Sequence, residues 1–388
     1  MSKWKLRLQN LFERVDDWSD AVRYRLRQFD DYDNLSIVPY MGFGNSEIAY
    51  IRGRILEDKG IRESSATDRA WQNLKNMYRH FETDEVPNAL VSAKFFEKEK
   101  ETVTDSEGYF SFELESFLAE ETELWHNVEL KLLKPLGENK EKVRADGRIL
   151  IPPPTAKFGV ISDIDDTILK TNVNNKLKMI LTTILSNAHT RVPFEGVAAF
   201  YRALQKGVSG NENNPIFYVS SSPYNLYPFL IKFLSLQKIP LGPIFLKDFG
   251  SHTPFTSGDH KTHKVENIKR VLETYRQMEF ILIGDNSEQD PEIYRQIVRD
   301  YPNRIRAIYI RKVNEEYENK TDVEKLIGEV QTGGSQLIFT PDSEFAANHA
   351  AGENLIAVED LAEIRRNKKL DKISPKPENL SEKVLIDD

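Results

Sequence analysis

The residues most suited to chemistry are three carboxylates, Asp163, Asp165 and Asp166, which follow directly on the apolar run 158–161. Carboxylates this close repel one another and are costly to remove from water unless a cation or a proton shares the site. At the end of a buried strand, such a cluster is typical of a Mg²⁺ site combined with a carboxylate nucleophile. The segment 163–167 is therefore the first candidate for chemistry, with a solvated acidic turn as the alternative.

Two further polar clusters follow apolar segments of the same kind. Residues 220–223 (Ser-Ser-Ser-Pro) come after the run 216–219, and residues 284–290 come after the run 280–283. Lys264 lies between the two clusters, at the head of an amphipathic helix. Because ligands bind outside the carboxyl ends of the strands in an open parallel sheet, we expect all these groups to meet at one edge.

These residues divide into roles for phosphoryl transfer. Asp163 is the first carboxylate past its strand and is expected to act as nucleophile, while Asp165, two residues on, points to the same side and serves as general acid and base. We expect Mg²⁺ on Asp163 and Asp285, with the backbone carbonyl of Asp165 and waters completing a hard oxygen set. Lysine at the site would neutralise developing charge. The expected phosphate-binding residues are Thr167, Ser220, Ser221 and Lys264.

Secondary candidates are Asn286, Asp290 and Arg191. Asp290 would anchor metal-bound waters or cap the helix that begins at Pro291. Arg191 would contact a phosphate or a headgroup, with a structural cap as the alternative. Asp166 is expected to cap or orient its turn and to do no chemistry.

The histidines near residues 249–262 invite a metal interpretation. Their spacing does not place them on one helix face, as a zinc site would require. We interpret them as loop or substrate-contact residues: His252, His260 and His263.

These segments resemble a known superfamily. Asp163-Ile164-Asp165-Asp166-Thr167, Ser220, Lys264 and Gly284-Asp285 are similar, in order and context, to the four motifs of the haloacid dehalogenase (HAD) phosphatases. Over roughly residues 150 to 360, four longer segments resemble the catalytic domain of the App1 family: 162–168, 191–196, 218–223 and 284–294. The resemblance implies a Mg²⁺-dependent phosphatase with an aspartyl-phosphate intermediate and, in fungi, a phosphatidate substrate. It does not extend to the residues before 150, so fungal partners are not carried over.

The elements that must position these residues are indicated by periodicity. After the prolines of 152–154, which mark a stiff boundary, buried apolar strands alternate with helices. This predicts a HAD-like, doubly wound parallel sheet in an α/β domain spanning 151–365. Before the boundary, period-two alternation predicts an antiparallel β-sandwich domain over 36–150, with a helical insert around 70–81 and a turn at 104–108.

Three further segments, the two ends of the chain and one internal apolar run, are interpreted separately. The pattern of residues 1–35 predicts an amphipathic helix. This helix either packs on its own domain or docks on a membrane. Residues 366–388 predict a charged flexible tail. The apolar segment 176–185 falls where the superfamily inserts a cap, and either contacts a lipid or packs on the sheet.

Composition excludes several classes. The 388-residue chain has a net charge of -8 and no cysteine, which removes disulfides, thiolate metal sites and a cysteine nucleophile. It lacks the clustered basic residues of nucleic-acid binders and has no apolar run of about 18 residues that would span a bilayer. We expect a cytoplasmic protein that touches membranes, if at all, from the surface.

The sequence therefore predicts a Mg²⁺-dependent phosphomonoester hydrolase that is phosphorylated on Asp163. By resemblance alone, the expected substrate is phosphatidate or a related lipid phosphate, cleaved to diacylglycerol and phosphate. The alternatives are a phosphatase of soluble metabolites, proteins or nucleic-acid ends, and a scaffold with a vestigial phosphatase core. Intact carboxylates at 163, 165 and 285 argue against the scaffold. No protein partner of the β-sandwich can be identified.

Overall fold

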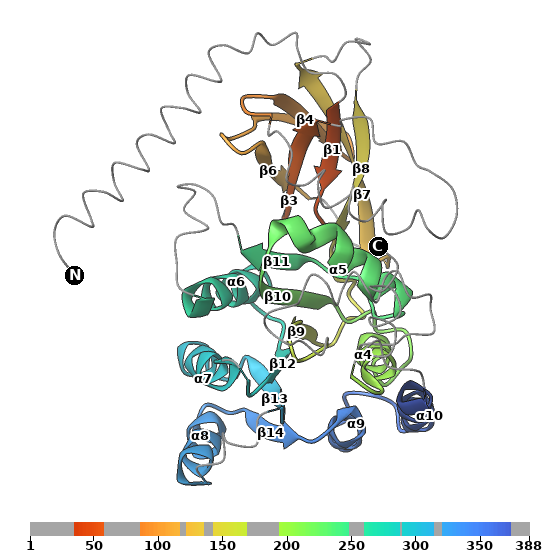
Figure 1. The fold of residues 1–388 in the computed structure, drawn as a ribbon, viewed down its shortest axis with the longest axis vertical. Helices are drawn as coiled ribbons and strands as arrows, with labels where there is room; N and C mark the ends of the chain where they lie inside the picture. Colours follow the sequence, from red (N-terminus) through yellow and green to blue (C-terminus); the bar gives the residue numbers. More distant parts are fainter. Residues whose placement is uncertain are drawn as a thin grey trace, which may run out of the picture.

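The structure, a computed structural model, contains two β-sheets that lie one above the other, with helices around the second (Figure 1). The described residues are 35–57, 86–116, 122–135, 143–168, 194–247, 260–287, 289–313 and 320–373. Five predicted features lie wholly or almost wholly outside them: the helix over 1–35, the insert around 70–81, the segment 176–185, Arg191 and His252. No helix in the described ranges is long and apolar enough to cross a membrane.

The second sheet has six strands, and every neighbouring pair is parallel. In spatial order these are β11 (Ile244–Lys247), β10 (Ile216–Pro223), β9 (Gly159–Asp163), β12 (Phe280–Asp285), β13 (Ile305–Arg311) and β14 (Gln336–Thr340). The chain therefore moves outward from β9 to one side and, from β12, to the other. The pair β9–β12 is the point at which the strand order reverses, where ligands bind in sheets of this type.

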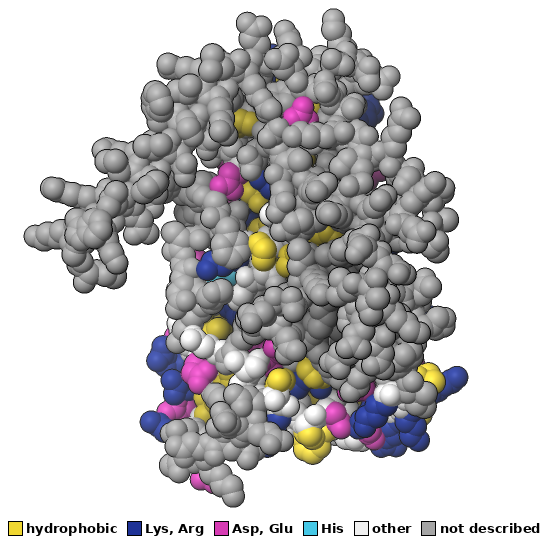
Figure 2. All heavy atoms as spheres, in the orientation of Figure 1, with side chains coloured by type: hydrophobic (Ala, Val, Ile, Leu, Met, Phe, Trp, Pro, Cys, Tyr) yellow, Lys and Arg dark blue, Asp and Glu magenta, His cyan; other side chains and the backbone are white. Residues whose placement is uncertain are grey.

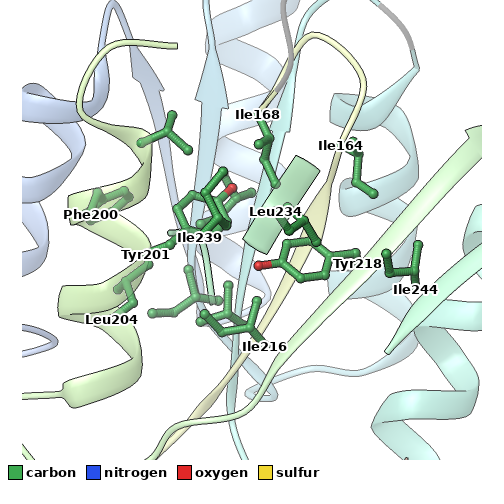
Figure 3. Close-up of a cluster of buried hydrophobic side chains, with 14 of the residues drawn as sticks. Ile164, Ile168, Phe200, Tyr201, Leu204, Ile216, Tyr218, Leu234, Ile239 and Ile244 are labelled. Carbon is green, nitrogen blue, oxygen red and sulfur yellow. The ribbon is translucent and has the colours of Figure 1, made fainter. Parts of the chain in front are cut away.

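Alternate side chains of these strands belong to two separate cores, because successive residues of a strand point to opposite faces. Val160 and Tyr218 pack in one core, whereas Ile161 and Phe217 pack in the other. Figure 3 shows the first core, with Tyr201 of a flanking helix lying against strand residues. This double burial explains why the strands are apolar throughout.

Helices cover both faces of the parallel sheet (Figure 1). On one face lie α6 (His260–Thr274), α7 (Asp290–Asp300) and α8 (Lys320–Thr332). On the other lie α4 (Val197–Lys206), α5 (Tyr227–Leu236), α9 (Ser343–Gly352) and α10 (Asp360–Ile373), with the short 3₁₀ turn η2 (Tyr224–Leu226) before α5. The predicted α/β class with a parallel sheet is confirmed.

The first sheet has eight strands, and its pairing differs from the predicted sandwich. The strands are β1 (Leu35–Pro39), β2 (Gly42–Gly44), β3 (Ile48–Glu57), β4 (Leu90–Phe95), β5 (Lys98–Val103), β6 (Tyr109–Glu115), β7 (Trp125–Lys134) and β8 (Arg144–Leu150). They form one connected sheet rather than two stacked ones, because the long strand β3 pairs with β1 and β2 along one edge and with β6 along the other. Pairing is antiparallel except between β2 and β8.

The edges of this sheet approach each other across β5 and β6. Lys100 Nζ of β5 donates to the carbonyl of Glu113 at 2.9 Å, and Lys98 pairs with Glu115. The apolar side chains of the strands gather in one interior core. The predicted turn over 104–108 joins β5 to β6 and is closed by Asp105, which accepts from the backbone N–H of Tyr109 at 2.9 Å.

The two sheets share buried residues. Phe43 of β2 packs in the same core as the helices α6 and α7, with its ring centroid 5.4 Å from that of Phe245. Tyr40 packs against Tyr227 of α5 at 4.6 Å, and the Tyr227 hydroxyl accepts from the Met41 N–H at 2.7 Å. The first sheet therefore completes the hydrophobic core of the second.

At the carboxyl end of the described chain, the structure has a helix, α10, that the sequence did not predict. It continues to Ile373, whereas the sequence predicts a flexible tail from residue 366. Lys368 of this segment is paired: its Nζ lies 2.7 Å from both Asp342 and Glu344. Asp371 accepts from the Gly196 N–H at 2.9 Å. These tertiary contacts hold a segment whose polar composition alone suggested disorder.

Candidate active site

Asp163 ends β9 at the reversal point of the sheet, and its carboxylate is 1% exposed. Lys264 Nζ of α6 lies 2.8 Å from Asp163 Oδ1 as an ion pair. Apart from this ion pair, neither carboxylate oxygen has a hydrogen-bond partner among the described residues. Burial raises the pKa of Asp163 well above its ordinary value, against the lowering effect of Lys264. A buried carboxylate whose oxygens accept no hydrogen bond is suited to bind a cation or attack an electrophile.

Asp165 lies two residues further on and is held by serines from β10. Its Oδ2 accepts from Ser220 Oγ at 2.9 Å and from Ser222 Oγ at 3.4 Å. The Ser220 hydroxyl in turn accepts from the Ser222 N–H at 3.0 Å. Ser220 is therefore oriented toward Asp165 and fixes the direction of this carboxylate.

Asp285 ends β12 beside Asp163, in the position expected from the sequence, and is fully buried. Thr167 Oγ1 donates to its Oδ2 at 3.2 Å, and the N–H and hydroxyl of Ser287 both donate to its Oδ1. Burial raises the pKa of Asp285 to about 6, with Asp290 adding to the rise. The Thr167 hydroxyl, predicted to bind phosphate, is thus directed at a carboxylate.

Asp290 begins α7 and belongs to the same cluster. Its Oδ1 lies 2.7 Å from Lys264 Nζ, and its Oδ2 accepts from the Asp285 N–H at 3.3 Å. Such a close approach requires glycine at position 284, because a Cβ there would lie 2.4 Å from Asp290 Oδ2. Asp290 is therefore part of the buried cluster itself, whereas the sequence ranked it as a secondary candidate.

The electrostatics of the cluster call for a cation. Asp163, Asp285 and Asp290 each offer a carboxylate oxygen, and these oxygens lie within 4.8 Å of one another. One buried lysine, Lys264, faces two of the three carboxylates. A surplus of buried carboxylates is unfavourable unless a further positive charge or protons compensate it. An all-oxygen donor set of this kind fits Mg²⁺, and it overlaps the predicted set at Asp163 and Asp285.

The remaining predicted residues have different surroundings. The Ser221 hydroxyl is buried and, in the described part of the chain, has no hydrogen-bond partner, which leaves it suited to a ligand oxygen. Asn286 Oδ1 accepts from the Val313 N–H at 2.7 Å and so links the loop to the end of β13. Asp166 has a left-handed backbone with φ 53°, and its carboxylate accepts from Ser287 at 3.4 Å, in keeping with a role in the turn.

His263, the residue before Lys264, is buried on α6. Burial lowers the pKa of His263 to about 4, so its imidazole is neutral at physiological pH. It belongs to a helix and not to the loop that the sequence suggested, and it is not part of the carboxylate cluster.

Arg311 is a further charged residue of this edge that the sequence did not indicate. It ends β13 opposite Asp285 in the strand register and is 8% exposed. Its guanidinium lies 4.0 Å from the Phe194 ring centroid and donates to Ser343 Oγ at 2.9 Å. Burial lowers the pKa of Arg311 to about 10, so it stays charged. No local signal distinguishes this arginine from others, because its burial depends on α9 and on the segment that precedes α4.

Residues 158–312 match the model of a family described as "Phosphatidate phosphatase APP1, catalytic domain". The chain is 33% identical over 157 residues to Phosphatidate phosphatase APP1 of Saccharomyces cerevisiae, which is 40% of this chain and 26% of that protein. It is 32% identical over 162 residues to an uncharacterized protein of Schizosaccharomyces pombe, or 41% and 26% of the two chains. The chain thus spans about a quarter of the length of these curated relatives.

Among solved structures, a carbohydrate acetylesterase from Xanthomonas citri aligns over 86% of this chain and 72% of its own, at 9% identity and a TM-score of 0.28. A likeness this low supports no inference about fold or function.

Proposed function

Because residues 158–312 contain an App1-like catalytic domain, we propose that the chain is a Mg²⁺-dependent phosphomonoester hydrolase of the HAD type. The observation that carries the proposal is the Asp163 carboxylate. It is buried at the strand-order reversal, beside Lys264, with neither oxygen accepting a hydrogen bond within the described ranges. The proposed substrate is a lipid phosphate of the phosphatidate type, which is the substrate that the name of the yeast relative gives for that protein.

In the proposed reaction, a carboxylate oxygen of Asp163 attacks phosphorus and the bond from phosphorus to the leaving oxygen breaks. Asp165, held by Ser220 and Ser222, gives its proton to that leaving oxygen. Asp165 then takes a proton from water, whose oxygen attacks the phosphorus of phospho-Asp163. Phosphate leaves and the Asp163 carboxylate is restored.

The other residues stabilise charge in this scheme. Mg²⁺, held by Asp163, Asp285 and Asp290, would supply electrostatic stabilisation of the transferring phosphoryl group. Lys264 lies close enough to Asp163 to neutralise charge on that group as well. Ser221 is the proposed hydroxyl donor to a phosphoryl oxygen, since its own hydroxyl is without a partner in the described structure.

The test is phosphate release from a substrate panel with Mg²⁺ present: phosphatidate in detergent micelles against sugar phosphates and nucleotides. We expect phosphatidate to be cleaved best, and Asp163→Asn to lower the rate by about 10⁴-fold or more, as is usual for loss of a covalent nucleophile. Asp146→Asn, an exposed change on β8, serves as control and should keep full activity.

Two results would count against parts of this proposal. Full Mg²⁺-dependent activity in Asp163→Asn would remove the nucleophile assignment. If soluble phosphomonoesters are cleaved but phosphatidate is not, the assignment as a hydrolase stands and the assignment of a lipid substrate is wrong. A cytoplasmic site of action at a membrane surface belongs to the lipid version of the proposal only.

A further inference from the structure

A cavity of about 300 Å³ lies at the junction of the two sheets, apart from the carboxylate cluster. Its wall is made by β2, β3 and β6 on one side, and by η2, β11 and α6 on the other. On the face drawn in Figure 2, hydrophobic and basic side chains are visible at the level between the sheets. A volume of this size is in the range of pockets for small organic ligands. The aromatic residues of the wall include Tyr40, Phe43, Tyr50, Tyr109 and Tyr224.

Two arginines from opposite sides line this cavity. Arg52 of β3 has its guanidinium carbon 5.3 Å from the Tyr109 ring centroid and 5.4 Å from that of Tyr224. Arg270 of α6 has its guanidinium carbon 5.2 Å from the Phe43 ring centroid and 5.0 Å from that of Tyr50. Stacking of this kind orients a guanidinium by its face, and its planar N–H fork is the geometry that matches a phosphate.

The wall carries four charged side chains, the arginines Arg52 and Arg270 and the carboxylates Asp105 and Glu113. Burial is the main cause that lowers the pKa of Arg270, and the nearby Arg52 adds to this lowering. The exposed carboxylate of Glu113 offsets part of this lowering of the Arg270 pKa. Asp105 Oδ1 accepts the N–H groups of Glu107 and Tyr109 in its own turn. Two like charges on opposite sides of a cavity are favourable when an anion is bound between them.

Tyr40 supplies a separate observation. It lines the cavity and is 4% exposed, and in the described part of the molecule its hydroxyl has no hydrogen-bond partner. A buried hydroxyl without a partner is costly, and most such groups in proteins are satisfied by protein, water or ligand. The neighbouring Tyr227 differs, because its hydroxyl accepts from the Met41 N–H.

We propose that this cavity binds a small phosphomonoester dianion between Arg52 and Arg270, with the Tyr40 hydroxyl as an additional donor. A dianion fits two guanidinium groups better than a carboxylate does, since a phosphomonoester offers three terminal oxygens and two negative charges to the two forks, whereas a carboxylate offers two oxygens and one charge. The bound anion would join the two sheets, because Arg52 and Tyr40 come from the first and Arg270 from the second. This inference does not depend on the proposed hydrolase activity.

The test is isothermal titration of sn-glycerol 3-phosphate into the full chain in EDTA, where turnover that needs Mg²⁺ is suppressed. We expect Arg52→Leu and Arg270→Leu each to weaken binding about ten-fold or more, as for loss of a hydrogen-bonded charge. Arg148→Leu is the matched control: this exposed arginine of the same sheet stacks on Trp125 at 4.7 Å, away from the cavity, and its loss should change nothing.

Lys264→Met distinguishes this site from the carboxylate cluster, and binding should survive it. Binding that is lost in Lys264→Met but kept in both arginine variants would place the ligand at the cluster and overturn the proposal. If the leucine variants do not fold, Tyr40→Phe and Arg270→Lys test the same site, because they keep the ring packing and the charge respectively. We expect each to weaken binding several-fold.

A second experiment distinguishes a free phosphomonoester from a lipid headgroup. In it, phosphatidylcholine vesicles with or without phosphatidate are sedimented with the protein. Binding of glycerol 3-phosphate with the expected dependence on the arginines indicates a free ligand. Arginine-dependent binding to phosphatidate vesicles alone indicates a lipid headgroup. Binding in neither arm would overturn the proposal.

Discussion

Lys264 is the residue on which the balance of charge at the cluster depends. Its ammonium group lies 2.8 Å from Asp163 and 2.7 Å from Asp290, and all three side chains are almost completely buried. Removing one member of a buried ion pair is expensive because the remaining charges stay buried without compensation. The same lysine is proposed to act in catalysis, so stability and activity depend on one side chain.

Lys264→Met is expected to lower the free energy of unfolding by about 3 kcal/mol or more at neutral pH in EDTA. The control is Lys269→Met on the same helix, which removes a partly exposed ion pair with Asp300 at 2.9 Å and should cost less than about 1 kcal/mol. Urea unfolding of both variants measures the difference. Equal losses in the two variants would mean that Lys264 does not compensate the carboxylates.

The pH dependence of stability follows from Asp285. Burial raises its pKa from 3.8 to about 6, with Asp290 adding to the rise, so the folded state keeps a proton that the unfolded chain has released. Without metal, the free energy of unfolding should therefore fall as pH rises through this window, by about 3 kcal/mol. Burial shifts the pKa of Asp163 in the same direction.

Urea unfolding in EDTA across the window from pH 3.8 to about 6 measures this dependence. Asp285→Asn should flatten it, and saturating Mg²⁺ should raise stability at the upper end, because the ion binds the folded state. Stability that increases across the window in EDTA would contradict the raised pKa.

At the scale of elements, the cluster depends on how closely α7 approaches the end of β12. Gly284 permits this approach, since a Cβ would lie 2.4 Å from Asp290 Oδ2 and 2.9 Å from the Tyr294 ring. Tyr294 in turn donates to the Ile283 carbonyl at 2.8 Å and so fixes α7 to the strand. The first turn of α7 and the end of β12 therefore act as one unit that presents Asp285 and Asp290 together.

Gly284→Ala should displace Asp290 from Lys264, lower the free energy of unfolding by about 1–3 kcal/mol and reduce phosphatase activity. Gly328→Ala on α8 is the matched control: its Cβ would meet nothing within 4 Å, and alanine should stabilise the helix by about 0.5–1 kcal/mol. Thermal unfolding and phosphate release measure both variants. Wild-type activity in Gly284→Ala would show that Asp290 need not approach the strand end.

At the scale of the whole molecule, the first sheet is structurally part of the same unit as the parallel sheet. Phe43 lies among Phe217 and Phe245, and Leu124 and Leu150 belong to the same core as α6 and α7. Separating the sheets would expose apolar side chains of both sheets to water, which is unfavourable. Unfolding should therefore be one cooperative event.

Phe43→Ala should destabilise the protein by about 3–5 kcal/mol. All four tryptophans precede residue 150, so their fluorescence reports on the first part of the chain, while loss of activity reports on the second. We expect the two urea transitions to coincide in the wild type and to shift together in Phe43→Ala. Phe345→Ala, at a ring that is 50% exposed on α9, should cost less than about 1 kcal/mol. Separate transitions would show that the two sheets unfold independently.

Several elements could be predicted from local pattern and several could not. The strands β9, β10, β12 and β13 were predictable because burial on both faces leaves them apolar throughout. β5 was not, because it is an exposed edge strand with the sequence Lys-Glu-Lys-Glu-Thr-Val, whose partner β4 supplies the pairing. The second half of α10 is predicted as a tail, because the residues with which it forms ion pairs, Asp342 and Glu344, are distant in the sequence.

The residues proposed to react were predicted from the sequence, since carboxylates at the ends of buried strands indicate a cation or nucleophile site. Their partners were not. Thr167 and Asp285 are 118 positions apart, and Ser220 and Asp165 are 55 apart, so only the assembled sheet brings each hydroxyl to its carboxylate. The third carboxylate of the candidate cation site, Asp290, and the cavity between the sheets likewise depend on packing between elements. Chemistry is encoded by residue type, whereas hydrogen bonds and burial are set by distances that folding creates.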